Sequence, residues 1–238
     1  MIRVIKVGGS LLTWPGLQEA LPRWLNTLTP ANNLLIFGGG ECIEAMRQLD
    51  ALWHLDSTAM HWRCVRLLDA TFEIAKELWP QWEAFPADSF PLYDEPPRED
   101  SATPAQTVQH PIVASGIDAT GPKITERLQH YLAEPRPYIE RNIIVHIASL
   151  YTRNMTMLPH NWATTTDSIA AYFARQFTAE ELILLKSTTP AGDISAHKAA
   201  ESGLVDAAFP TIAPRSCRIL TVDLTSNTWH ANHIRSSP

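Results

Sequence analysis

The sequence predicts an α/β fold, a three-layer αβα sandwich built on a mainly parallel sheet. Short apolar runs rich in β-branched residues alternate with segments of helical periodicity, which is typical of parallel sheets. The first two runs each end in consecutive glycines before a helical segment, as strand-to-helix turns do. The length of 238 residues suffices for one large domain or two small lobes. The predicted strands are residues 2–7, 34–37, 143–148, 181–186 and 218–224.

The composition argues against several classes of partner. The formal net charge is −6 and the pI is about 5.8, so no broad basic field is available to bind nucleic acid. The N-terminus has the pattern of a strand rather than of a signal peptide, and no apolar run approaches the roughly twenty residues that span a bilayer. The three cysteines, Cys42, Cys64 and Cys217, have neither zinc spacing nor a disulfide pattern. We therefore expect a cytoplasmic protein with no membrane partner.

The first predicted strand ends at Gly8 and Gly9, and Ser10 follows them. Glycines let the backbone approach a ligand closely, and the unpaired N–H groups of a helix start can bind phosphate. Lys6 adds a positive charge near the same turn. The turn is therefore either an ordinary tight connection or a phosphate site. The next segment, 17–28, is predicted as an amphipathic helix because leucines recur at steps of three and four.

A second glycine turn follows the second predicted strand. Gly38, Gly39 and Gly40 separate that strand from a predicted helix over 41–52. Two such turns within forty residues favour the phosphate interpretation, because the carboxyl ends of parallel strands gather ligands at one edge of a sheet.

Two helical residues are candidate contacts for a substrate. Arg47 is either solvated and ion-paired or directed at a phosphate, which guanidinium groups bind well. His61 lies in a helix predicted over 56–78, with Asp56 or Ser57 as the N-cap. A histidine beside a tryptophan in a helix is either ordinary packing or a ligand contact.

The middle of the chain, 85–111, is rich in proline and acidic residues and cannot sustain a helix. It is either a surface loop or edge hairpin, or a lid over the substrate, because long structureless loops are uncommon without a role. A turn at 116–121 and a short helix at 124–132 are predicted after it.

A further helix is expected to begin near Asp167, with Thr165 or Thr166 as its N-cap. Taken alone, an aspartate in the first turn need only complement the helix dipole. The strand that follows ends in Lys186 and Ser187, at the edge where ligands gather. Lys186 is either a solvated lysine or a phosphate contact.

The chain closes with the strand 218–224 and a tail that is polar from Thr225 onward. His230 and His233 in this tail form a weak metal motif because no further ligands accompany them. No metal ligands are therefore assigned.

Together these motifs resemble the amino acid kinase superfamily, which includes acetylglutamate kinase, uridylate kinase and isopentenyl phosphate kinase. The matching stretches are Lys6-Val-Gly-Gly-Ser10, Gly38-Gly-Gly40 and Trp162-Ala-Thr-Thr-Thr-Asp167-Ser-Ile-Ala-Ala. The resemblance implies an enzyme that transfers a phosphoryl group from ATP, with Mg²⁺, to a small acceptor. In those kinases the aspartate that matches Asp167 orients lysines that neutralise the transferring group. The resemblance thus implies Lys6, Asp167 and Lys186 as catalytic residues.

The remaining site residues divide by expected ligand. The phosphate- and nucleotide-binding residues are Gly8, Gly9, Ser10 and Ser187. The acceptor-binding residues are Gly38, Gly39, Gly40, Arg47 and His61.

Residues 1–80 and 140–210 are similar to one branch of this superfamily, the archaeal kinases of methanofuran biosynthesis and related bacterial proteins of one-carbon metabolism. The matching residues are the glycine triplet, Arg47, Leu49-Asp50, His61-Trp62 and Gly203-Leu-Val-Asp206. Members of that branch phosphorylate an aminomethyl-furan methyl phosphate to the diphosphate. The similarity implies an acceptor that already carries a phosphate.

The resemblance divides the chain into an acceptor half, 1–150, and a nucleotide half, 151–238, on one continuous sheet. The nucleotide half is shorter than that of typical family members. In those members a later lysine reaches the nucleotide phosphates, and Lys198 is the only lysine left in this chain for that role. Two alternatives therefore stay open: a non-catalytic protein that binds a nucleotide or oxyanion, and a structural or regulatory subunit. The expected partners are a small-molecule acceptor and further copies of the chain in a homo-oligomer.

Overall fold

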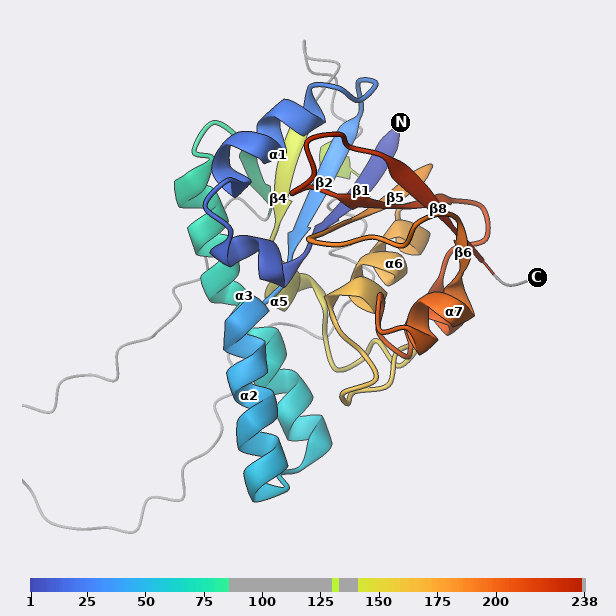
Figure 1. The fold of residues 1–238 in the computed structure, drawn as a ribbon. Helices are drawn as coiled ribbons and strands as arrows, with labels where there is room; N and C mark the ends of the chain where they lie inside the picture. Colours follow the sequence, from blue (N-terminus) through green and yellow to red (C-terminus); the bar gives the residue numbers. More distant parts are fainter. Residues whose placement is uncertain (86–129, 133–140, 237–238) are drawn as a thin grey trace, which may run out of the picture.

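The structure is a computed structural model that describes residues 1–85, 130–132 and 141–236 (Figure 1). Within these ranges an eight-stranded sheet has the order β3-β4-β2-β1-β5-β7-β8-β6. All neighbouring strands are parallel except β7 and β8. The strands are β1 (Ile2–Val7), β2 (Asn32–Phe37), β3 (Glu83–Phe85), β4 (Arg141–Val145), β5 (Glu181–Lys186), β6 (Ile194–Ser195), β7 (Arg218–Asp223) and β8 (Ala231–Arg235).

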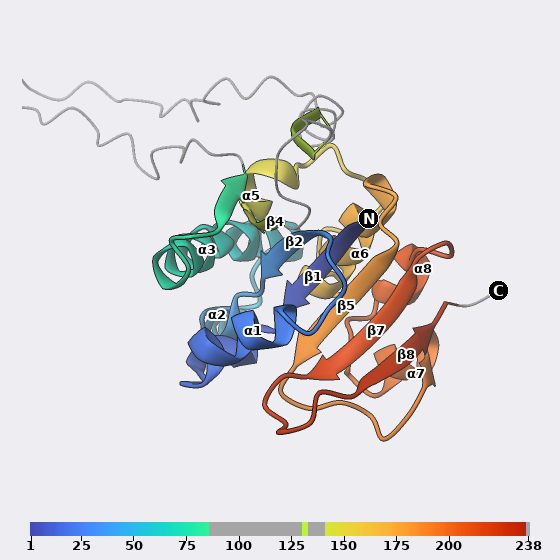
Figure 2. The same ribbon diagram turned by 90° about the horizontal axis from the view of Figure 1, so that it is seen from above.

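Helices cover both faces of the sheet, so the protein has the predicted three-layer α/β architecture (Figure 2). Successive side chains of a strand point to opposite faces. On β1, Val4 faces the core that contains α6, whereas Ile5 faces the core that contains α1. The described helices are the 3₁₀ helix η1 (Gly9–Thr13), α1 (Leu17–Leu25), α2 (Gly40–Trp53), α3 (Ser57–Leu78), α5 (Ile147–Leu150), α6 (Thr166–Gln176), α7 (Ala196–Glu201) and α8 (Phe209–Ile212).

Two predicted N-caps are present. The Asp56 side chain accepts a hydrogen bond from Ala59 N at 2.7 Å and caps α3. The Thr165 side chain accepts one from Asp167 N and caps α6. Side-chain caps of this kind satisfy backbone donors that a helix start leaves unpaired.

The helical segment predicted after the first glycine turn is the short 3₁₀ helix η1. The predicted helix 17–28 ends earlier, at Leu25, where Thr27 donates its side-chain hydroxyl to the Trp24 carbonyl and closes the last turn.

The predicted strand 143–148 also ends early, at Val145. Its neighbour β3 has only three residues, and the amide of His146 donates the last hydrogen bond to Phe85 O at 2.9 Å. Helix α5 begins at Ile147, so the apolar run continues as a helix instead of a strand.

The polar tail after Thr225 contains a strand that was not predicted, because its segment 231–235 forms β8. This strand pairs antiparallel with β7, and Leu220 lies opposite His233. Ile234 is its one buried residue, so the segment lacks the apolar alternation that marks most strands.

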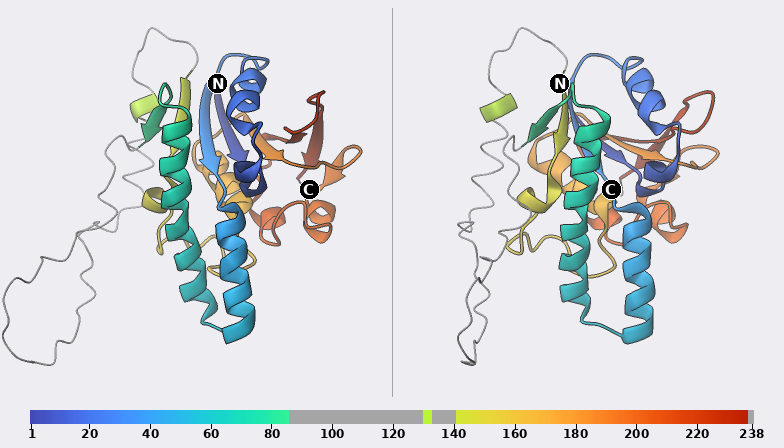
Figure 3. Two further views of the ribbon diagram at one scale, coloured as in Figure 1. Left: turned by 60° about the vertical axis from the view of Figure 1, so that its left-hand side comes forward. Right: turned by 90° about the vertical axis from the view of Figure 1, so that its left-hand side faces the viewer.

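Helices α2 and α3 form a hairpin that projects beyond the sheet (Figure 3). No residue of α2 is fully buried, and its far end exposes Leu49, Leu52 and Trp53. The near end of the hairpin borders the site described below.

Three predictions lie wholly or largely outside the described residues: the segment 85–111 beyond Phe85, the turn 116–121 and the helix 124–132. Of the last, residues 130–132 are described and are helical. No helix in the described ranges has the length and apolar character needed to cross a membrane.

Candidate functional site

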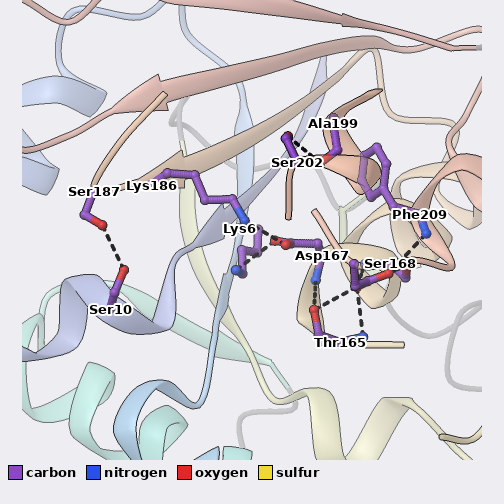
Figure 4. A network of polar contacts seen from close by, with 11 residues as sticks. Lys6, Ser10, Thr165, Asp167, Ser168, Lys186, Ser187, Ala199, Ser202 and Phe209 are labelled. Atoms are coloured by element: carbon purple, nitrogen blue, oxygen red, sulfur yellow. Dashed lines mark hydrogen bonds and ion pairs between the residues drawn. The ribbon is translucent and has the colours of Figure 1, made fainter. Parts of the chain in front are cut away.

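Two lysines meet at the carboxyl ends of β1 and β5. These strands are adjacent and parallel, with Lys6 opposite Leu184 and Lys186 at the end of β5. Lys6 and Lys186 share the strand face of Val4 and Leu184, which is the face that packs against α6. The fold therefore directs both ammonium groups toward the start of α6 (Figure 4).

Asp167 in the first turn of α6 bridges the two lysines (Figure 4). Its Oδ1 lies 2.8 Å from Lys6 Nζ, and its Oδ2 accepts a hydrogen bond of 2.7 Å from Lys186 Nζ. The side chain of Asp167 is 6% exposed, and those of Lys6 and Lys186 are 7% and 15% exposed. The structure thus brings together the three predicted catalytic residues, and one carboxylate pairs with two ammonium groups.

This arrangement changes the ionisation of the cluster. Burial alone would raise the pKa of Asp167, but the charges of Lys186 and Lys6 outweigh burial and lower that pKa to about 2. Burial lowers the pKa of Lys186, and the Asp167 carboxylate opposes that shift. Asp167 is therefore ionised at neutral pH and holds two lysine side chains whose ammonium groups suit an anionic ligand.

Asp206 fixes the start of α6 and was not assigned to the site from the sequence. Its carboxylate accepts hydrogen bonds from the amides of Thr165 (2.8 Å) and Ser168 (3.0 Å) and from both hydroxyls. It also accepts one from Phe209 N at 3.1 Å. Asp206 lies in the Gly203-Leu-Val-Asp206 stretch, which was the available signal, but Thr165 and Ser168 are about forty residues away in the sequence.

The two glycine turns pack backbone against backbone. A Cβ on Gly9 would lie 2.2 Å from Gly40 N, and a Cβ on Gly40 would lie 2.5 Å from Gly9 O. Gly40 also has a φ of +54°, which disfavours other residues. Contact between the two turns thus explains why glycine is needed at Gly9 and Gly40, whether or not a ligand also approaches the backbone there.

The backbone amides of Gly8 and Gly38, which were predicted to bind phosphate, are already engaged in hydrogen bonds of the sheet. Gly8 N donates to Leu185 O at 2.8 Å, and Gly38 N donates to Val7 O at 3.0 Å. These amides extend the strand pairing and are not available to a phosphate.

The other amides of the two turns remain available. Among the described residues, no acceptor pairs with the N–H groups of Gly9, Ser10, Gly39 and Gly40. Successive unpaired amides next to cationic side chains form the kind of concavity that binds phosphate.

Replacement of Gly9 by alanine is expected to lower the free energy of unfolding by about 1–3 kcal/mol, because the new Cβ would overlap the Gly40 backbone. Urea denaturation measures the change. Gly192→Ala is the matched control, since a Cβ there meets nothing within 4 Å. Equal stability of the two variants would contradict the packing account.

Ser10 and Ser187 also come together. Their Oγ atoms lie 3.2 Å apart on the exposed side of the lysines (Figure 4). They connect the turn after β1 with the turn after β5. Lys198, the remaining lysine considered for a phosphate contact, lies exposed on α7.

A cavity of about 210 Å³ adjoins Lys6. The start of α2, one face of α3 and the segment before α6 form its walls. It is lined by Lys6, Gly9, Gly38, Gly39, Gly40, Ile43, Glu44, Arg47, His61, Cys64, Val65, Leu68, Trp162, Thr164, Thr165, Thr166 and Ile169. All five predicted acceptor-binding residues belong to this lining.

Arg47 lies at the rim of the cavity. Its guanidinium stacks over the Trp162 ring at 4.8 Å and lies 3.5 Å from Glu44 in an exposed ion pair. The indole N–H of Trp162 donates to Asp50. Trp162 is a cavity residue that the sequence motif contained but that was not assigned to the site. The ion pair with Glu44 involves Nε, and a guanidinium has five N–H donors, so the stacked group can also bind an anion.

The described residues of the site fit phosphate oxygens better than they fit a dedicated metal site. The unpaired amides and two lysines suit phosphate oxygens, whereas both oxygens of Asp167 already contact lysines. No group of three His, Cys, Asp or Glu side chains in the described ranges could hold a metal ion. Mg²⁺ commonly binds through one or two carboxylates together with substrate phosphates and water instead of through a full set of protein ligands.

Comparison with known proteins supports the fold. No protein-family model matches the sequence, and no curated protein matches it. Among solved structures, the UMP kinase from Bacillus anthracis has a TM-score of 0.58 at 10% identity, over 100% of this chain and 96% of that chain. The UMP kinase from Ureaplasma parvum and the uridylate kinase from Archaeoglobus fulgidus each have a TM-score of 0.51 at 13% identity, over 93% of this chain and over 88% and 90% of theirs.

These similarities concern the fold, because the sequence identities are low. They agree with the mostly parallel eight-stranded sheet and its flanking helices. The chain has the amino acid kinase fold, as UMP kinases do.

Proposed function

We propose that this protein transfers a phosphoryl group from ATP to a small acceptor that already carries a phosphate. The observation that carries the proposal is the buried bridge in which Asp167 holds Lys6 and Lys186 side by side. Burying three charged side chains costs desolvation free energy, which favours a functional role for them. The bridge lies between unpaired backbone amides and a cavity. Like the fold, this arrangement favours a small-molecule kinase.

The chemistry requires positioning and charge neutralisation more than covalent steps. An oxygen of the acceptor phosphate attacks the γ-phosphorus of ATP. A new P–O bond forms as the bond to the β–γ bridging oxygen breaks, and ADP leaves with that electron pair. A phosphate oxygen is already ionised, so the attack needs no general base. Mg²⁺ bound to the nucleotide supplies further charge neutralisation.

The residues of the bridge would act on the charge of the transferring group. Lys6 and Lys186 would neutralise its oxygens, and Asp167 would hold both ammonium groups in place. The amides of Gly9 and Ser10, with the hydroxyl of Ser187, would hold phosphates of the nucleotide. Lys6 lines the acceptor cavity as well, which suits a residue between two substrates.

The acceptor would bind in the cavity between α2 and α3. The amides of Gly39 and Gly40 and the guanidinium of Arg47 would bind its phosphate. The sequence resemblance favours an aminomethyl-furan methyl phosphate, as in methanofuran-type cofactor biosynthesis and one-carbon metabolism. UMP is the second candidate because the solved structures of similar fold are named for it.

Arg47→Ala is expected to raise the KM for the acceptor about tenfold and to leave kcat nearly unchanged, because a rim guanidinium binds the substrate and the transition state alike. Steady-state rates measured by ADP release check this result. Arg66→Ala, on an exposed position of α3, is the matched control. A large fall in kcat at unchanged KM would contradict the assignment of Arg47 to acceptor binding.

Isothermal titration of ATP, with and without Mg²⁺, tests the proposal and separates it from two other roles. Micromolar binding that depends on Mg²⁺, followed by turnover of an acceptor phosphate, supports a kinase. Nucleotide binding without turnover of either candidate acceptor would favour a non-catalytic binding protein. Absence of nucleotide binding would favour a structural or regulatory subunit.

The proposal extends to partners and location. We propose a homo-oligomer in the cytoplasm that binds neither nucleic acid nor membranes, on the basis of the family resemblance, the acidic net charge and the cysteine usage. Sedimentation velocity at micromolar protein concentration tests self-association, and a monomeric mass would contradict it.

A further inference from the structure

The first turn of α6 carries Asp167, and little within the helix holds this turn in place. The first amides of a helix have no partner inside it, and helix ends fray. The N-cap hydroxyl of Thr165 accepts from Asp167 N at 3.4 Å, which is longer than a typical hydrogen bond. A turn held only in this way would let Asp167 move relative to the two lysines. Another group must therefore fix it.

Asp206, in the segment between α7 and α8, supplies that support from outside the helix. Its Oδ2 accepts hydrogen bonds from the amide of Thr165 at 2.8 Å, from the hydroxyl of Thr165 at 2.7 Å and from the amide of Ser168 at 3.0 Å. Its Oδ1 accepts from the Ser168 hydroxyl and from Phe209 N at 3.1 Å. Thr165 and Ser168 lie before and after Asp167 in the chain. One carboxylate therefore holds the turn on both sides of Asp167.

The segment around Asp206 is itself anchored to the body of the protein. Val205, Ala208 and Phe209 are buried in the core that contains α6. Ala208 N also donates to Ala163 O at 2.8 Å, in the segment just before α6. Asp206 thus acts from a fixed frame.

The contacts of Asp206 favour its ionised form. All the hydrogen bonds described for it come from N–H or O–H donors, and such bonds stabilise a carboxylate. Burial, followed by the charge of Asp167, raises the pKa of Asp206, and the bonds from Ser168 and Thr165 oppose that shift. Burial lowers the pKa of Lys186, and the charges of Asp167 and Asp206 oppose that shift. Asp167 contacts the lysines directly, whereas Asp206 binds the backbone beside Asp167.

The turn that Asp206 holds also forms part of the acceptor cavity. Thr165 and Thr166 line this cavity together with Lys6. A shift of the turn would therefore move Asp167 and the cavity wall together. The amides proposed to bind ATP lie on other turns and would stay in place.

We infer that Asp206 is a positioning residue for phosphoryl transfer, whose carboxylate fixes the first turn of α6 and thereby keeps Asp167 between the two lysines. This inference rests on the proposed function of the lysine cluster. Asp206 acts through Asp167 and does not itself touch the transferring group. Because such catalysis depends on position, a misplacement of about 1 Å can cost on the order of 10² in rate.

Asparagine is the informative replacement for Asp206, because it keeps the size of the side chain and replaces one oxygen with an NH2 group. Oδ1 faces the amide of Phe209, and Oδ2 faces the amides of Thr165 and Ser168. Whichever way the asparagine amide turns, its NH2 group meets a backbone N–H donor, so the contact on that side is lost. Asp56→Asn is the matched control, because it keeps the Oδ1 atom that caps α3.

The arrangement can be measured in the free protein by proton–nitrogen NMR of the lysine ammonium groups. The chain has five lysines, so their signals can be assigned by replacing them one at a time. The signals of Lys6 and Lys186 are expected to shift in Asp206→Asn and to stay unchanged in Asp56→Asn. Unchanged signals in a folded Asp206→Asn protein would overturn the inference whether or not the protein is a kinase.

Steady-state kinetics measures the effect on the reaction. Asp206→Asn is expected to lower kcat on the order of tenfold and to leave the KM for ATP within about twofold, because the phosphate-binding amides lie on other turns. Asp56→Asn should keep both constants. A role in stability alone would lower the urea midpoint of Asp206→Asn and leave the kcat of the folded protein unchanged, and that result would overturn the inference.

The outcomes separate the two proposals. Wild-type protein that turns over neither candidate acceptor would overturn the proposed function, and the lysine signals would still decide whether Asp206 positions the cluster. If Asp206→Asn does not fold, Ser168→Ala takes its place, since it removes one hydroxyl donor to Asp206 and no backbone contact. A smaller shift of the same two signals is then expected, and the absence of any shift would overturn the inference.

Discussion

Lys6→Met is expected to lower kcat by about 10²–10³, with a much smaller change in the affinity for ATP, because removing a charge that acts on the transition state has an effect of this order. The ammonium of Lys6 contacts Asp167 at 2.8 Å and also lines the acceptor cavity, so it lies where charge would be transferred. Methionine keeps most of the length of the side chain and removes its charge. Asp167 retains its hydrogen bond to Lys186, so the fold is expected to persist.

Rapid-quench kinetics at saturating ATP and acceptor check this result. Lys76→Met, on α3 away from the site, is the matched control and should keep the wild-type rate. A wild-type rate in Lys6→Met would remove Lys6 from the chemistry.

Asp167→Asn is expected to lower the free energy of unfolding at pH 7 by about 3–5 kcal/mol, because it leaves two buried ammonium groups without their carboxylate. The amide has the same shape, so loss of charge is the main change. Urea denaturation measures the difference, with Asp193→Asn in an exposed loop as the control.

The effect of Asp167→Asn should depend on pH in a defined direction. The pKa of Asp167 falls from 3.8 to about 2 on folding, so its ionisation stabilises the native state above pH 3.8. That stabilisation, about 2 kcal/mol, is lost as the pH falls through the folded value of about 2. The difference between wild type and variant should therefore narrow between pH 4 and pH 2. A constant difference over this range would show that the carboxylate charge does not stabilise the fold.

Much of the fold could be predicted because its central strands carry a strong local signal. β1, β2 and β5 are rich in apolar residues that are buried on both faces, as expected of parallel strands inside an α/β sandwich. β8 has no such signal, because only Ile234 is buried and pairing with β7 defines the strand. The short β3 likewise depends on a partner far away in the sequence, β4.

The site could be predicted in part for a similar reason. Lys6, Asp167 and Lys186 each lie next to a recognisable local feature, namely a glycine turn, a helix cap and the end of an apolar strand. The role of Asp206 could not be predicted, because its hydrogen bonds to Thr165 and Ser168 join distant segments.

The glycines illustrate the limit of a local argument. Conformational freedom and access for a ligand are properties of one turn, and they predicted a phosphate site at both turns. The close approach of Gly9 to Gly40 depends on the pairing of β1 with β2, as does the hydrogen bond from Gly38 N to Val7 O. Neither contact is encoded in the spacing of the glycines alone.

Phosphorus-31 NMR of the wild-type protein with ATP, Mg²⁺ and each of the two candidate acceptor phosphates tests the central claim most directly. The account predicts that ADP appears together with a new diphosphate of one acceptor, and that Lys6→Met slows both signals equally. Micromolar binding of ATP and of an acceptor with no diphosphate formed over many hours would contradict the claim that this site transfers a phosphoryl group.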